Sequence, residues 1–129
     1  MPDLLDVELD DGVIVVRYDG RPDDEVFQKY LQSYTDLVYR RVPYTAVYST
    51  LPGARIPSGA NARLQAAWMK REQPIIGQYC RGLAFALPSP LMRGVLRGVL
   101  TLQPLVADHI VVDNEAEAVA WARSRLQSA

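Results

Sequence analysis

The stretch Tyr44–Trp68, YTAVYSTLPGARIPSGANARLQAAW, holds the pattern that decides the fold. Its first part, Tyr44–Ser49, is rich in β-branched and aromatic residues and predicts a buried strand. Prolines and glycines follow between Leu51 and Gly59, which predicts a turn-rich loop. Ser58 then stands where a helix N-cap is expected. We expect the rest of the chain to hold this loop in place.

Strands and helices alternate on both sides of this stretch. Asp10-Asp11-Gly12 separates two apolar segments and predicts a β-hairpin. The expected strands lie around residues 7–9 and at 12–18, 44–49, 82–87 and 109–112, and the expected helices at 23–41, 58–73, 75–80, 89–102 and 114–126. The order β-β-α-β-α-β-α-β-α predicts a single-domain α/β fold with a mixed, largely parallel sheet and helices packed on it.

Capping residues mark the expected helix ends. Asp23 or Asp24 caps the first helix, and Arg40 and Arg41 are expected to close it. Pro74 is expected to break the second helix, because proline removes a backbone hydrogen bond and clashes with the preceding turn. Further caps are expected at the Ser89-Pro90 pair and at Asn114 with Glu117.

The bulk composition is that of one globular domain. The chain has 129 residues, of which 49% are hydrophobic and 22% charged. No apolar run approaches the roughly 18 residues that span a bilayer, and the acidic N-terminal segment lacks the features of a signal peptide. Cys80 is the single cysteine, which excludes an internal disulfide and fits a reducing compartment. We therefore expect a cytoplasmic protein without an integral membrane segment.

Charge is segregated along the chain. Residues 1–25 hold nine acidic residues against Arg17 and Arg21, whereas residues 40–97 hold nine basic residues against Glu72 alone. Such segregation fits either two solvated faces or a field that steers a charged partner.

The sequence does not predict a catalytic, metal or cofactor site. A reactive thiol needs a base nearby, and nothing in the sequence brings His109 to Cys80. One histidine and one cysteine are too few for a common zinc site, and neither common glycine-rich phosphate loop is present. Nucleic-acid binding needs a basic face with exposed aromatic residues, but the tyrosines of the basic segment fit core positions. We expect a protein that is not an enzyme and does not bind nucleic acid.

The element order and the segment after the third strand resemble the STAS domains, which include the anti-sigma-factor antagonists and are related in architecture to the CRAL-TRIO, Sec14-like proteins. In the antagonists, a strand leads into a loop with an Asp-Ser-Ser-Gly-type motif, whose phosphorylated serine lies at the start of the next helix. Residues 46–64, AVYSTLPGARIPSGANARL, follow the same order. Ser58-Gly59 occupies the matching place, but Ile56-Pro57 precedes it instead of an acid and a serine.

The resemblance implies a bacterial regulatory domain that binds another protein in a partner-switching or signalling pathway. Ser58 is then a candidate phosphorylation site, and the expected interaction site comprises Ser58, Gly59, Arg55 and Arg63. A phosphate at a helix N-terminus is stabilised by free N–H groups and the helix dipole, and the flanking arginines can pair with it. The alternative is that Ser58 serves only as a helix cap.

The expected helix at 91–102 is apolar over half of its circumference and carries two glycines. Gly94, Gly98 and Thr101 form a strip of small residues beside the apolar side. Each internal glycine costs about 1 kcal/mol relative to alanine, so a close backbone contact is expected to offset that cost. The contact is with the sheet or a neighbouring helix, with a second subunit, or with a membrane surface. The second alternative predicts a homodimer whose seam is this strip.

Arg93 and Arg97 stand one turn apart on the same helix. They form either a solvated polar stripe or a clamp for a phosphate or carboxylate. The clamp suggests an alternative function, a module that binds a small molecule or lipid in an apolar pocket and holds its acidic head with the two arginines.

Overall fold

The computed structural model describes residues 4–55, 58–102, 104–105 and 107–127. A five-stranded sheet in the order β1-β2-β3-β4-β5 lies at its centre. The first strand, β1 (Leu4–Asp10), is antiparallel to β2 (Val13–Asp19). The strands β2, β3 (Tyr44–Thr50), β4 (Cys80–Ala86) and β5 (His109–Val112) run parallel. The predicted mixed, largely parallel sheet is confirmed.

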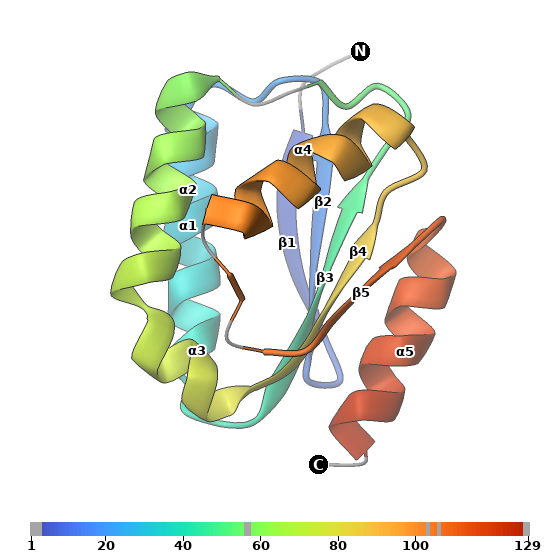
Figure 1. Ribbon diagram of the computed structural model, residues 1–129. Helices are drawn as coiled ribbons and strands as arrows, with labels where there is room; N and C mark the ends of the chain where they lie inside the picture. The colour runs from blue at the N-terminus through green and yellow to red at the C-terminus, as the bar shows by residue number, and fades with distance from the viewer. Residues whose placement is uncertain (1–3, 56–57, 103, 106, 128–129) are drawn as a thin grey trace.

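Helices cover both faces of the sheet (Figure 1). They are α1 (Asp24–Val38), α2 (Gly59–Arg71), α3 (Gln73–Tyr79), α4 (Pro90–Leu102) and α5 (Glu115–Gln127). The first four lie on one face, and α5 packs against β3 and β4 on the other. No helix in the described ranges has the length and apolar character needed to cross a membrane.

The first four residues of β2 are apolar because both faces of the strand are covered there. Ile14 and Val16 face the core shared with α1, whereas Val13 and Val15 face the core shared with α5. All four side chains are buried. The period-2 geometry of a strand therefore divides one apolar run between two cores.

An aromatic cluster joins α1 and α2 to the sheet. The Tyr34 ring stacks on Tyr48 of β3 with centroids 5.9 Å apart, and it meets Trp68 of α2 edge-on at 5.1 Å. The Trp68 indole Nε1 donates a hydrogen bond of 2.8 Å to Thr35 Oγ1. Such aromatic pairs contribute about 0.5–1.5 kcal/mol each beyond the area that they bury.

Most predicted turns and caps are confirmed. Asp11 and Gly12 adopt φ of 49° and 84°, the left-handed pair of a two-residue hairpin turn. Asp23 Oδ1 accepts from Val26 N, and Asn114 Oδ1 accepts from Glu117 N, each at 2.9 Å.

Two helix boundaries were also predicted, and one of them differs in the structure. The helix break at Pro74 is confirmed, because α2 ends at Arg71 and α3 begins at Gln73. The expected close of α1 at Arg40 and Arg41 is wrong, because the helix ends at Val38. Arg41 has a φ of 57°, outside the right-handed helical region, so the chain has already turned away there.

Candidate functional site

The loop after β3 is held by backbone hydrogen bonds to the end of β2 and to the residue that follows it. Leu51 N donates to Tyr18 O at 2.8 Å, Gly20 N donates to Gly53 O at 3.1 Å, and Arg55 N donates to Gly20 O at 2.8 Å. The loop therefore extends the parallel pairing beyond the ends of the two strands. The sequence predicted a turn-rich loop here but not this pairing.

Gly53 stands where the loop comes closest to the end of β2. A Cβ at this position would lie 2.5 Å from Asp19 Oδ1. The Asp19 carboxylate is buried and accepts a 2.9 Å hydrogen bond from Gly20 N. On the other side of the loop, the Tyr18 hydroxyl donates to Arg55 O at 2.8 Å. Glycine is required at position 53 because the carboxylate fills the space of a side chain.

Ser58 caps α2, as predicted. Its Oγ accepts a hydrogen bond of 3.1 Å from Asn61 N, and its backbone is extended. The Asn61 side chain is buried, and its Nδ2 donates to Pro22 O at 3.2 Å. This second bond ties the first turn of α2 to the segment that precedes α1. The start of α2, which Ser58 caps, is therefore fixed to the segment before α1.

The structure brings Gly59 and Arg63 together next to Ser58. Gly59 begins α2 and is exposed, and a Cβ on it would lie 3.5 Å from Arg63 Nη1. Arg55 ends the described part of the loop, before Ile56 and Pro57, which lie outside the described residues. A serine hydroxyl, a helix N-terminus and a guanidinium group thus share one small area.

The sequence did not predict that acidic residues lie beside Ser58. A shallow groove of about 500 Å³ runs beside Ser58, and its lining comprises Arg21, Pro22, Asp23, Asp24, Glu25 and Ser58. The first turn of α1 therefore faces the first turn of α2. Consecutive right-handed crossovers begin at the same edge of a parallel sheet, so the topology carried the signal for this contact. The site has mixed charge, because carboxylates and Arg21 line the groove and Arg63 lies near Gly59.

The helix α4 packs on the core with one side only. Met92 and Leu96 contact the core cluster, but Leu91 and Val99 are 64% and 39% exposed. These two residues leave apolar surface exposed on that side of α4.

The two glycines of α4 have no close neighbour in the described chain. A Cβ built on Gly94 or on Gly98 meets no described atom within 4 Å. The expected close contact of these glycines with the sheet or a neighbouring helix is therefore wrong within the part of the chain that the structure describes. Thr101 lies on the same helix, and its Oγ1 donates to Arg97 O at 2.9 Å. The seam formed by Gly94, Gly98 and Thr101 stays a prediction.

Arg93 and Arg97 have different surroundings. Arg93 Nε donates to Leu87 O at 2.7 Å, and its guanidinium group pairs with Asp113. Arg97 is exposed. An anion held by both Arg93 and Arg97 would have to displace Asp113 from Arg93. The Arg93 pair also fixes the start of α4 to the segment after β5.

Cys80 and His109 occupy different positions in the sheet. Burial raises the pKa of the Cys80 thiol, which donates to Gly82 O at 3.5 Å. His109 is exposed at the start of β5, and its register partner on β4 is Leu83, three residues beyond Cys80. Its ring lies edge-on to Phe85 at 6.2 Å. Within the described ranges, no three His, Cys, Asp or Glu side chains are grouped so as to hold a metal ion.

Comparisons with known proteins identify the fold. No protein-family model matches the chain, and no curated protein matches it. Solved structures do. An uncharacterised DUF3478-family protein with a SpoIIAA-like fold from Shewanella loihica PV-4 matches with a TM-score of 0.66 and 13% identity over 93% of each chain. The chain has a STAS-like fold.

Two further structures with this STAS-like fold are similar. An anti-sigma factor antagonist from Mycobacterium paratuberculosis has a TM-score of 0.57 and 19% identity over 95% of each chain. The Bacillus cell fate determinant SpoIIAA in its phosphorylated form has a TM-score of 0.59 and 18% identity, over 92% of this chain and 98% of that one. The STAS-like fold that the element order predicted is confirmed over nearly the whole chain.

Proposed function

We propose that this chain is a non-catalytic regulatory domain that acts by binding another protein in the bacterial cytoplasm. The contact surface comprises the loop from Leu51 to Ser58 and the first turn of α2. Anti-sigma factor antagonists share the fold, which supports a regulatory role of this type. A partner-switching or signalling pathway is the setting that we propose.

The observation that carries the proposal is the fixed position of this loop. Backbone bonds from Tyr18 and Gly20 hold residues 51–55, and the Asn61 side chain holds the first turn of α2. A surface that is already ordered loses little conformational entropy when a partner binds. Its charges are mixed, because acidic residues and Arg21 line the groove and Arg63 lies near Gly59.

We also propose Ser58 as a phosphorylation site, with Arg55 and Arg63 as its cationic neighbours. A phosphate adds between one and two negative charges at neutral pH, and the N–H groups of the α2 N-terminus favour it. Across the groove it would meet Asp24 and Glu25, so the same charge would repel the first turn of α1. Phosphorylation would therefore change the sign of the surface on the α2 side without a change of fold.

A site-specific crosslink in the native cells tests the contact surface. A photo-reactive residue replaces Arg63 in one variant and Lys29, an exposed residue of α1, in the control. The proposal predicts a discrete crosslinked partner from position 63 and none from position 29. Equal crosslinking from both positions, or none from position 63, would contradict it.

A labelling experiment tests the phosphorylation separately. The wild type and Ser58→Ala are incubated with host lysate and labelled ATP. Labelling of the wild type alone is expected. Equal labelling of both proteins, or labelling of neither, would contradict a phosphoserine at position 58.

We propose that the exposed side of α4 is the seam of a homodimer. Leu91 and Val99 offer apolar surface there, and Gly94 and Gly98 leave room for a second backbone. A symmetric dimer would place the same helix on both sides of the seam.

A further inference from the structure

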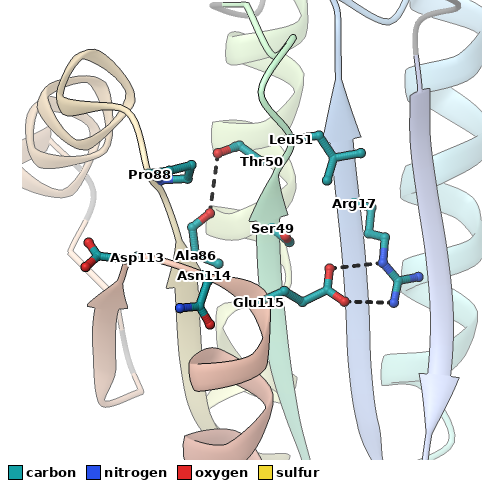
Figure 2. Close-up of a pocket in the computed structure, with 9 residues that line it drawn as sticks. All are labelled: Arg17, Ser49, Thr50, Leu51, Ala86, Pro88, Asp113, Asn114 and Glu115. Atoms are coloured by element: carbon teal, nitrogen blue, oxygen red, sulfur yellow. Dashed lines mark hydrogen bonds and ion pairs between the residues drawn. The ribbon is translucent and has the colours of Figure 1, made fainter.

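A second hollow opens at the carboxyl ends of the parallel strands, on the side of α5 (Figure 2). The chain leaves β4 toward α4 on one face of the sheet and leaves β5 toward α5 on the other. Open α/β sheets bind their ligands in crevices outside the carboxyl ends of their strands. Here the crevice has a volume of about 420 Å³, within the range of small-molecule sites.

The floor and rim of the crevice come from β3, β4 and the segments that follow them. Ser49 is buried, and Thr50 Oγ1 donates to Ala86 O at 3.3 Å (Figure 2). Leu51 and Pro88 supply apolar surface at the rim. Two hydroxyl-bearing side chains therefore stand next to an apolar edge.

The charged side chains that line the crevice are already paired. Both oxygens of Glu115 accept from Arg17, from Nε to Oε1 and from Nη2 to Oε2, at 3.0 Å each (Figure 2). Arg17 also pairs with Glu8 at 2.7 Å. Asp113, on the opposite wall, pairs with Arg93. A charged ligand would have to compete with one of these pairs, which favours an uncharged ligand.

The polar groups at the crevice include both donors and acceptors. The helix α5 begins at Glu115, and the first N–H groups of a helix have no acceptor within the helix. The Asn114 side chain accepts a hydrogen bond from the backbone N–H of Glu117, not from the N–H groups before it. A ligand hydroxyl both donates and accepts, so it can pair with a carboxylate oxygen and with a backbone N–H in the same site.

We propose that this crevice binds an uncharged, hydroxyl-rich small molecule, of which a monosaccharide is the representative. Its hydroxyl groups pair with Thr50, Glu115 and the first N–H groups of α5, and its C–H surface packs on Leu51 and Pro88. The inference does not depend on the proposed protein-binding role, because the groove at Ser58 and this crevice have different lining residues.

A titration followed by two-dimensional amide NMR tests the site. D-glucose and D-ribose are the probes, and sodium phosphate and ethylamine are the charged comparisons. We expect saturable shifts with a sugar at the amides of residues 49–51, 86–87 and 113–116. Absence of such shifts with both sugars, shifts centred elsewhere, or stronger saturation with a charged probe would overturn the proposal.

Two variants sharpen the titration. Thr50→Val keeps the side-chain shape but removes the hydroxyl, and Ser33→Ala removes a hydroxyl from the exposed side of α1. One lost hydrogen bond corresponds to a roughly 3- to 10-fold weaker affinity. We expect that loss for Thr50→Val and none for Ser33→Ala. Equal sugar affinity in the wild type and Thr50→Val would overturn the proposed contact, and the wild-type shift map tests the site even if this variant folds poorly.

Discussion

Arg17 and Glu115 form a two-pronged ion pair between residues 98 positions apart in the chain. The guanidinium group lies on β2 and the carboxylate in the first turn of α5. Arg17 Nη1 also donates to Glu8 of β1 at 2.7 Å. Hydrogen bonds that Arg17 donates to Glu115 and Glu8 raise the pKa of Arg17, and the hydrogen bond from Arg17 lowers the pKa of Glu115. One arginine therefore joins the hairpin to the last helix.

Removal of either partner of this pair should destabilise the fold. The side chains of Arg17 and Glu115 are 28% and 32% exposed, so solvent screens the pair only in part. We expect a coupling free energy of about 1 kcal/mol for this geometry. Urea unfolding of Arg17→Met, Glu115→Gln and the double variant measures it. A coupling free energy indistinguishable from zero would contradict a stabilising role.

The same pair should make stability depend on acid pH. The folded-state pKa of Glu115 lies below its ordinary value of 4.5, so its contribution is complete above that pH and is lost as the pH falls through the lowered value. We expect Glu115→Gln to show a flatter decline of the unfolding free energy below about pH 5 than the wild type. Glu25→Gln, on the exposed surface of α1, is the control. Parallel pH curves for wild type and Glu115→Gln would refute the assignment.

Gly53→Ala should destabilise the protein, because its Cβ would lie 2.5 Å from Asp19 Oδ1. The carboxylate is held by Gly20 N, so relief of the clash moves the loop or breaks that bond. We expect a loss of about 1–3 kcal/mol, typical of overpacking. Gly59→Ala is the matched control, since its Cβ would meet Arg63 Nη1 at an ordinary 3.5 Å. Thermal melts that rank the two variants in the opposite order would disprove the close contact.

Ser58→Ala should weaken α2 through the lost cap. The hydrogen bond from Asn61 N disappears, at a cost of about 1 kcal/mol. Ser58→Asp should retain the cap and much of the stability, because aspartate is as good an N-cap as serine. Chemical unfolding of both variants measures the difference. The two variants also separate the capping role of Ser58 from its proposed role in partner binding. A binding defect in a fully stable Ser58→Asp variant comes from the added charge.

The glycines of α4 provide the test of the proposed dimer. Gly94→Ala and Gly98→Ala meet no described atom within 4 Å, so each should add up to about 1 kcal/mol of helix stability within one chain. Gly98→Leu should instead block a second backbone and shift sedimentation equilibrium toward the monomer. An unchanged oligomeric state for Gly98→Leu would exclude this seam.

The sequence predicted the elements because their signals are local. The left-handed turn at Asp11-Gly12, the Ser58 cap and the break at Pro74 each depend on a few adjacent residues. The apolar run of β2 likewise reports its burial on both faces. These features need no knowledge of distant contacts.

The remaining features depend on how the elements come together. The Arg17–Glu115 pair joins β2 to α5, and the sequence around neither residue indicates the other as its partner. The acidic turn beside Ser58 follows from the placement of two helix starts at one sheet edge. The apolar surface of α4 was expected to be largely covered, but how closely a helix packs is set by the loops that hold it, which periodicity does not describe.

The backbone pairing of residues 51–55 with Tyr18 and Gly20 has a kinetic consequence. A partner would meet this surface as a nearly rigid body, with no folding step after the encounter. Association should then be governed by diffusion and by the charges around Ser58, and should slow as ionic strength rises.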